Sequence, residues 1–367
     1  MIATRSAASA DNAALIDLAA ACPMVGDITM CVDRNPDFFA LNRLEGDRWS
    51  VGIAQNSNTG ITGCVALASR RAYLFGEPSD TAYAGDLKVH PRARGGRTAE
   101  SLIGWARNGL AELGPDDLPS LVTIMAGNRD MERLTDGRRG NPVFERFATV
   151  RVHAVPLLLP RRPAAADLRI APADANDVGA MMALWRRVAP GRQFAPVFDP
   201  DQFTRWVASA PGLRLHDYWL ARRRDGQLAG FIGIWEQSTF KQLRVLAYSR
   251  RLAAMRLMVN AAARITGSAM LPPPGAVLRT ATAVHVCVPG DSPRVLHALL
   301  RRIHETLRAR HFSVFTIGLD PRDPLSAALG GLMAQPTDVH GYVTTRAGHY
   351  AGPRLDDRPF HYDIALV

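Results

Sequence analysis

Lysine is almost absent from this 367-residue sequence. Only Lys88 and Lys241 are lysines, so 42 of the 44 basic side chains are arginines. The arginines are dispersed in twos and threes, with no basic run of six or more. The net charge of +10 therefore indicates a solvated basic surface, which is the simplest interpretation, and nucleic-acid binding remains an open alternative.

Cysteine pairs and long hydrophobic runs are also lacking. The four cysteines lie far apart, at Cys22, Cys31, Cys64 and Cys287. With no C-x-x-C pair and no histidine at ligand spacing, we expect neither disulfides nor a metal site, but buried thiols in a reducing compartment. No stretch reaches the roughly 18 apolar residues of a membrane span, and Asp11 and Asp17 interrupt any signal-peptide core. We expect a soluble, cytoplasmic protein without a membrane partner.

What the sequence does contain is an internal repeat. The length suits two domains of roughly 100–200 residues each. A short strand and a helix at the start of the chain, Ile2–Arg5 and the turns around Leu15, are repeated by Leu168–Ile170 and the turns around Met181. Each pair is followed by a hairpin whose turn contains Gly60 in one half and Gly226 in the other, again 166 residues apart.

This offset predicts two copies of one α/β fold. We place the first copy at residues 1–159, a linker without apolar periodicity at 160–167, and the second copy at 168–367. The second copy is longer between its hairpin and its next loop. Helical apolar spacing over Lys241–Thr266 predicts an inserted helix there, with a basic outer face.

The stretch Tyr83–Ile103 carries the clearest chemical signal. It predicts a strand, a basic glycine-containing loop and then a helix, an arrangement that directs backbone N–H groups and the positive end of the helix dipole at an anion. A phosphate or pyrophosphate is the natural ligand, although an ordinary strand-to-helix turn is the alternative. The residues expected to bind it are Arg92, Arg94, Gly95, Gly96, Arg97, Thr98 and Ala99.

This stretch resembles the acyl-CoA motif of the GNAT (GCN5-related N-acetyltransferase) superfamily, approximately V-x-P-x-x-R-G-x-G-x-G/A. The matching positions are Val89, Pro91, Arg94, Gly95 and Ala99, whereas Arg97 replaces the middle glycine and Gly96 lies one place early. The resemblance implies a mixed-sheet α+β fold in two tandem copies. It also implies acetyl-CoA as acyl donor, with direct transfer and no metal.

The resemblance further implies roles for single residues. Backbone amides near Leu87 and Val89 would polarise the thioester carbonyl, and Asn128 would contact the pantetheine arm. Asp86 becomes the candidate general base, with a structural carboxylate as the alternative. The usual thiolate-protonating tyrosine is missing after the next strand. Tyr83 and Tyr73 are substitutes only by their proximity in sequence, and a packed aromatic is the alternative for each.

The second copy has a poorer loop at the equivalent place. Asp291 puts a carboxylate where pyrophosphate would lie, Pro293 removes an N–H donor, and Gly290 is the only glycine of that loop. We therefore expect a degenerate CoA site, with the second copy shaping the substrate cleft or a dimer surface.

The leading hypothesis is an acyl-CoA N-acyltransferase that moves an acetyl group from acetyl-CoA to the primary amine of a small molecule. A non-catalytic acyl-CoA-binding or sensing protein is the alternative, and a nucleic-acid-associated protein a weaker one. A homodimer is compatible with the apolar surface of the inserted helix.

Overall fold

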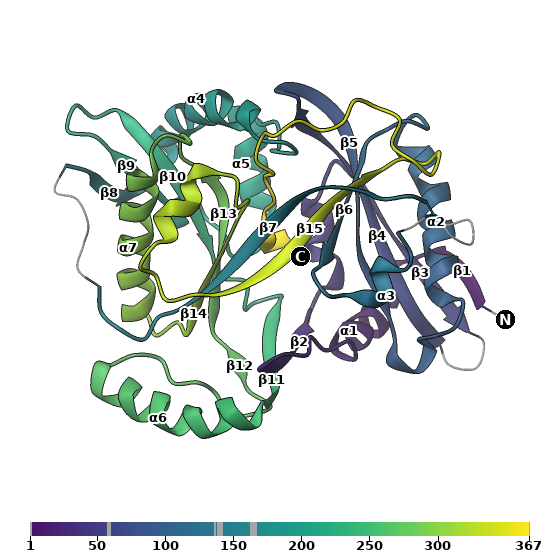
Figure 1. Cartoon of the computed structure of the whole chain (residues 1–367), viewed down its shortest axis with the longest axis horizontal. Coiled ribbons are helices and arrows are strands. Elements are labelled where there is room, and N and C mark those ends of the chain that lie inside the picture. Colours follow the sequence, from purple (N-terminus) through teal and green to yellow (C-terminus); the bar gives the residue numbers. More distant parts are fainter. Residues whose placement is uncertain (1, 57–59, 136, 138–141, 162–166, 367) are drawn as a thin grey trace.

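A twelve-stranded mixed sheet runs through the whole protein (Figure 1). The structure is a computed structural model that describes residues 2–366 except 57–59, 136, 138–141 and 162–166. The strand order is β1-β3-β4-β5-β6-β15-β7-β14-β13-β10-β9-β8, and a separate three-stranded sheet has the order β12-β11-β2.

The two halves of the chain share a core order of elements, namely a strand, a helix, a hairpin, a strand, a helix and two strands, while β2 and α3 belong only to the first half and α5, β11, α6 and β12 only to the second. The helices and strands of the first half are β1 (Ile2–Ser6), α1 (Asn12–Ala20), β2 (Ile28–Asp33), β3 (Arg48–Asn56), β4 (Gly60–Leu74), β5 (Glu77–Val89), α2 (Thr98–Leu113), β6 (Ser120–Met125), α3 (Arg129–Glu132) and β7 (Glu145–Pro156). Those of the second half are β8 (Arg169–Pro172), α4 (Val178–Val188), α5 (Pro200–Ser209), β9 (Tyr218–Arg222), β10 (Leu228–Trp235), β11 (Gln242–Tyr248), α6 (Arg250–Thr266), β12 (Val277–Leu278), β13 (Thr280–Cys287), α7 (Pro293–Ala309), β14 (Val314–Leu319) and β15 (Gln335–Thr344).

Helices cover both faces of the sheet because its central strands are apolar on both sides. On β4, Cys64 and Ala66 pack in the cluster that contains α1, whereas Val65 and Leu67 pack against α2. Successive side chains of a strand point to opposite faces, so this alternation sets α1 and α2 on opposite sides of one sheet. In the second half, α4 and α5 lie against one face and α7 against the other.

The two copies exchange their last strands. β7 of the first half pairs with β14 of the second over six residues, from Arg151–Leu319 to Pro156–Val314. Conversely, β15 of the second half pairs with β6 of the first, and β7 and β15 pair with each other at the centre of the sheet. The repeat is thus confirmed as a tandem fold with a shared middle, which the offset alone did not indicate.

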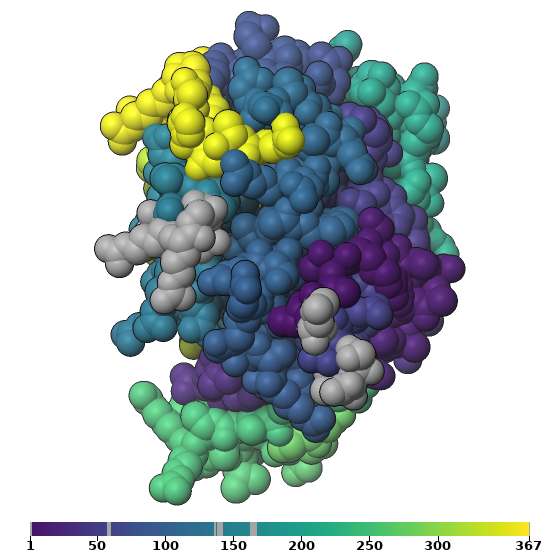
Figure 2. Space-filling model, turned by 90° about the vertical axis from the view of Figure 1, so that its right-hand side faces the viewer, coloured from purple at the N-terminus to yellow at the C-terminus, as the bar shows by residue number. Residues whose placement is uncertain are grey.

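The inserted segment is partly a strand. The helix expected over Lys241–Thr266 begins only at Arg250, because Leu243 and Val245 alternate on β11, which pairs with β2 of the first copy. Helix α6 then stands at the edge of the molecule, at the bottom of Figures 1 and 2. None of the described helices is both long and apolar enough to span a membrane.

The boundaries at 159 and 168 stay a prediction. β7 ends at Pro156 and β8 begins at Arg169, so the join between the halves falls between them. Most of the expected linker, 162–166, lies outside the described residues.

Candidate functional site

Strands β5 and β6 separate at the site that the motif predicts. They pair in parallel over only three residue pairs, from Ala82–Ser120 to Ala84–Val122. Directly after these paired residues, β5 forms a bulge against β4. In this bulge, Asp86 adopts a left-handed backbone conformation with φ of 55°. Such a conformation is uncommon for a non-glycine residue, and bulges frequently redirect a side chain beside a functional site.

The basic loop leads from β5 into α2. A short 3-10 turn, Pro91–Ala93, is followed by Gly95 at a φ of 77°, which favours glycine. Helix α2 begins at Thr98, and Arg97 at its N-cap position makes no side-chain capping bond. A helix N-terminus without a side-chain cap is suited to binding an anion.

The predicted cofactor residues converge on this loop. Arg92, Arg94, Gly95, Gly96 and Arg97 are exposed, Ala99 is half-buried and Thr98 is buried. The Arg94 Nε donates to the carbonyl of Val89 at 3.4 Å, which holds one arginine over the end of β5. Strand β4 also packs closely against the end of β5, just before the loop. A Cβ atom on Gly63 of β4 would lie 2.7 Å from the Lys88 carbonyl oxygen.

Leu87 and Asn128 occupy different settings. Leu87 is half-buried, packs with the α2 cluster and is the second residue of the bulge, after Asp86. Asn128 is exposed and caps α3, because its Oδ1 accepts from the Met131 N–H at 3.3 Å. Their roles toward CoA remain predictions.

Asp86 is a nearly buried carboxylate held by two cations. It pairs with Arg34, which follows β2, and with Lys88 two residues along β5. Burial alone would raise the pKa of Asp86, but the two cations outweigh burial and hold it well below its usual range. A carboxylate in this state is a weak base, and its role as general base remains a prediction.

Tyr83 lies in the core rather than at a solvent-filled cleft. Its hydroxyl is within 3.2 Å of the Tyr362 hydroxyl and 3.5 Å of Thr123 Oγ1. Burial raises the pKa of Tyr83 above its ordinary value. The hydroxyl therefore has structural partners already, and its role as an acid stays a prediction.

Three charged residues that sequence reasoning did not select join this site: Arg34, Glu45 and Lys241. Glu45 is 3.5 Å from Arg70, and burial raises the pKa of Glu45 to about 7. Burial, reinforced by the charge of Arg34, lowers the pKa of Lys241 to about 7. A usable signal was present in the sequence, since the only two lysines of the chain, Lys88 and Lys241, both interact electrostatically with Asp86.

The equivalent gap of the second copy is filled by the C-terminal segment. β13 and β14 also pair over only three residues, from Thr280–Val314 to Thr282–Thr316. Asp363 Oδ1 accepts from the His285 N–H at 2.8 Å, and Ile364 packs where a Cβ on Gly318 would lie. The cavity left there is about 20 Å³, room for about one water molecule.

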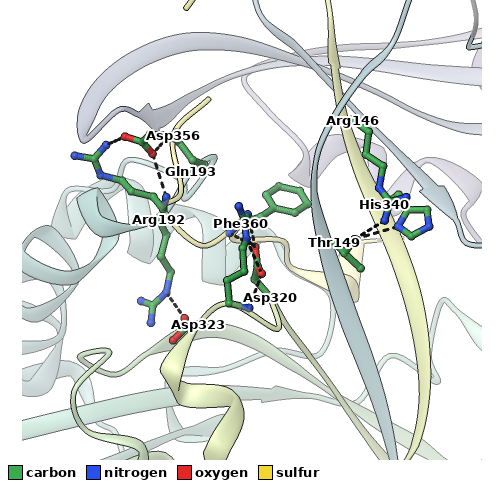
Figure 3. A network of polar contacts seen from close by, with 11 residues as sticks. Arg146, Thr149, Arg192, Gln193, Asp320, Asp323, His340, Asp356 and Phe360 are labelled. Atoms are coloured by element: carbon green, nitrogen blue, oxygen red, sulfur yellow. Dashed lines mark hydrogen bonds and ion pairs between the residues drawn. The ribbon is translucent and has the colours of Figure 1, made fainter. Parts of the chain in front are cut away.

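Side-chain bonds fix the approach of this segment (Figure 3). The Phe360 N–H donates to Asp320 Oδ2 at 2.8 Å, and Gln193 Nε2 donates to Asp356 Oδ1 at 2.6 Å. Asp291 is exposed in the loop before α7, and the degenerate CoA site expected in this copy stays a prediction.

No group of three or more potential metal-binding side chains occurs among the residues that the structure describes. All four cysteines are free, and three of them are buried, namely Cys31, Cys64 and Cys287.

Comparisons with known proteins identify the fold. No protein-family model matches the sequence, and no curated protein matches it either. Among solved structures, N-myristoyltransferase of Saccharomyces cerevisiae with bound myristoyl-CoA aligns over 94% of this chain and 82% of its own, with a TM-score of 0.62 and 12% identity. A GCN5-related N-acetyltransferase from Sphaerobacter thermophilus aligns over 94% and 96%, with a TM-score of 0.58 and 13% identity. A third, from Anabaena variabilis, covers 94% and 73%, with a TM-score of 0.53 and 13% identity. Together with the element order and the splayed strands, these alignments show that the chain has the GNAT fold in two tandem copies.

Proposed function

We propose that this protein is an acyl-CoA N-acyltransferase that transfers an acetyl group to the primary amine of a small acceptor. The observation that carries the proposal is the exposed loop with Arg92, Arg94 and Arg97 at the uncapped start of α2, beside the splayed end of β5. Charge-assisted donors and helix N–H groups together suit a pyrophosphate. Its structural neighbours include proteins described as N-acetyltransferases and as N-myristoyltransferases with bound myristoyl-CoA.

The reaction would be a direct transfer. The neutral amine of the acceptor attacks the thioester carbonyl, a C–N bond forms, and the C–S bond breaks as the CoA thiolate leaves. Backbone N–H groups near Leu87 and Val89 would stabilise the oxyanion, a contribution of about 3–4 kcal/mol per donor in other acyl-transfer sites. The proton lost by the amine and the proton gained by the thiolate balance.

In the proton transfer, Asp86 would accept a proton and pass it on to water at once, and would not stay protonated. Its two ion pairs hold its pKa so low that it keeps a proton only transiently. We therefore place it between the acceptor ammonium and water, next to the bulge where the acyl group would arrive.

Release of free CoA thiol tests the proposal. The full-length protein is incubated with acetyl-CoA and a panel of amines, and thiol appearance is followed with a chromogenic disulfide reagent. Saturable, amine-dependent release from the wild type is expected, with a loss in Arg94→Glu and none in Arg251→Glu, an exposed arginine of α6 that lies outside the loop. Mass spectrometry of the purified protein for retained CoA is an independent check.

A non-catalytic acyl-CoA-binding or sensing protein is the second candidate. The enclosed hydroxyl of Tyr83 and the doubly paired Asp86 favour it, because both groups have structural partners. It predicts that acetyl-CoA binds but that no amine of the panel releases thiol. Turnover on any amine removes this candidate.

A further inference from the structure

Large apolar side chains gather on α6 and its neighbours, at the edge of the molecule. Of the eleven large apolar side chains that the described structure leaves exposed, six lie from Leu246 to Met270. The most exposed of these are Leu257, Met258 and Ile265, at 78%, 75% and 88%. Single exposed apolar side chains are normal, whereas a group of them on one element marks a surface for a partner or a membrane.

The enclosed and exposed residues of α6 separate into two faces. The buried and half-buried ones recur at helical spacing and form an inner face: Leu252, Arg256, Val259, Asn260, Ala263 and Thr266. Asn260 fixes this face to the segment that follows, since its side chain exchanges two hydrogen bonds with the backbone of Leu271, at 2.8 and 3.1 Å. Leu257, Met258 and Ile265 belong to the opposite, outer face of the helix, which points away from the protein (Figure 1).

Arginines continue this outer face at both ends of α6. Arg250, Leu257 and Arg264 follow one another at intervals of seven residues, about two helical turns, so they lie in one line along the helix. Both arginines are exposed, and neither forms an ion pair with a residue that the structure describes. The outer face is therefore apolar in the middle and positively charged at its two ends.

Acidic side chains are scarce in this part of the molecule. Residues 237–290 contain no aspartate or glutamate, whereas they contain seven lysines and arginines. A groove of about 740 Å³ between α6 and the segment that follows is lined by three arginines and by no acidic residue. Asp27, Asp33 and Glu236 border the region from other segments. Seven cations against three bordering carboxylates leave this end of the molecule positive.

These features favour an anionic lipid surface over other partners of a basic and apolar face. In a two-fold dimer formed through α6, Arg250 and Arg264 would approach the equally positive face of the other copy. A nucleic acid would match the arginines but would leave Leu257, Met258 and Ile265 without an apolar contact. An anionic bilayer matches both, because its acyl region accepts apolar side chains and its phosphates attract arginines.

We propose that α6 binds this protein to the surface of an anionic lipid bilayer. The helix lies in the plane of the surface, with Leu257, Met258 and Ile265 at the boundary between headgroups and acyl chains, and with Arg250 and Arg264 at the level of the phosphates. Surface binding of this kind needs no spanning helix, and the expectation of no membrane partner was drawn from the lack of a span. The proposal does not depend on acyl transfer, since α6 contributes no residue to the CoA loop.

Co-sedimentation with vesicles tests the proposal. The full-length protein is mixed with vesicles of phosphatidylcholine alone or of phosphatidylcholine with phosphatidylglycerol, and the bound fraction is measured after centrifugation. Binding should be at least tenfold tighter to the vesicles that contain phosphatidylglycerol, because each arginine near an anionic surface contributes about fivefold. The affinity should fall as salt is added, since salt screens exposed charges.

Paired variants separate α6 from the overall charge of the protein. Leu257→Ser with Ile265→Ser should weaken vesicle binding at least tenfold, because the apolar area that enters the bilayer is lost. Arg250→Gln with Arg264→Gln should weaken it about fivefold for each charge removed. Because the side chains are exposed, these variants should keep the Tm of the wild type.

Matched controls change exposed residues away from α6. Met333→Ser removes an exposed apolar side chain, and Arg223→Gln with Arg224→Gln lowers the net charge by the same amount as the α6 pair. Both controls should bind vesicles within about twofold of the wild type, since neither alters the outer face of α6.

Four results would overturn the proposal. Two of them are equal binding to both kinds of vesicle, and equal binding by the α6 variants and the wild type. The third is a dimer in light scattering that Leu257→Ser with Ile265→Ser dissociates, because α6 would then be an interface between copies. The fourth is duplex DNA that displaces the vesicles and still binds this serine variant, which would assign the face to a nucleic acid.

Discussion

Asp86 and His285 occupy the same position in the two copies. Each is the first of two residues that oppose a single residue of the neighbouring strand, and each has a left-handed φ, 55° and 50° respectively. Asp86 meets Arg34 and Lys88, whereas the His285 ring is 2.8 Å from the Tyr218 hydroxyl and is sealed by aromatic side chains. One backbone geometry therefore supports an ionic site in the first copy and a closed core in the second.

Neutralising Asp86 should strongly destabilise the protein. Asp86→Asn tolerates the left-handed backbone but leaves Arg34, which is 3% exposed, without its counter-ion. We expect a loss of about 3 kcal/mol in the free energy of unfolding, measured by urea denaturation. Asp80→Asn, at an exposed pair with Arg71, should cost less than about 0.5 kcal/mol. Equal costs for the two variants would contradict the ionic account of Asp86.

His285 should make stability depend on pH. Burial lowers the pKa of His285 to about 4, partly opposed by Asp363 and reinforced by His361, against about 6.5 in the unfolded chain. Between these values the unfolded state binds more protons, so stability falls as pH decreases from 7 to 5, by about 2 kcal/mol for this residue.

The comparison with His285→Asn isolates that contribution. Other partly buried histidines titrate in both proteins. The contribution of His285 is therefore read from the difference in unfolding free energy between the wild type and the variant. The difference in unfolding free energy should shrink by about 2 kcal/mol on going from pH 7 to pH 5. A constant difference over this range would show that His285 is not held neutral.

Tyr83→Phe separates a packing role from an acid role. The Tyr83 hydroxyl bonds within a group that includes Tyr362 and Thr123, so its removal should cost about 1 kcal/mol of stability and leave kcat within about threefold. An acid role predicts a fall of about 10²–10⁴ in kcat. The kcat of the purified variant, measured by thiol release, decides between them.

The strand exchange predicts that the first copy does not fold alone. Residues 1–159 end in β7, whose partners β14 and β15 both belong to the second half. Expressed by itself, this fragment should lack the near-ultraviolet circular dichroism of a packed protein. Co-expression with residues 160–367 should restore it. A monomeric, cooperatively unfolding 1–159 fragment would contradict the shared-sheet account.

Local patterns predicted the repeated units because each element buries a face readable from its own residues. The hairpin of β3 and β4, the basic loop and the inner face of α2 follow from spacing over fewer than 20 residues. The exchange of β7 and β15 does not, because both strands would satisfy the same apolar pattern in either copy. Which strands pair depends on contacts between segments far apart in the sequence, and these contacts form only in the assembled sheet.

The site was only partly predictable for the same reason. The motif identified Asp86 and the arginine loop, which are contiguous in sequence. Arg34, Glu45 and Lys241 come from segments up to about 200 residues apart, and only the pairing of β2 with β11 brings Lys241 beside Arg34. The strand character of β11 was hidden by apolar residues that also fit a helix.

Calorimetric titration of acetyl-CoA tests the central claim most directly. The wild type should bind with saturable heat, and Arg94→Glu combined with Gly95→Pro should weaken binding at least tenfold, since it reverses one loop charge and forbids the φ of 77° at Gly95. Arg251→Glu on α6 changes net charge as Arg94→Glu does and should bind normally. No heat with the wild type, or equal binding by the loop variant, would contradict the account.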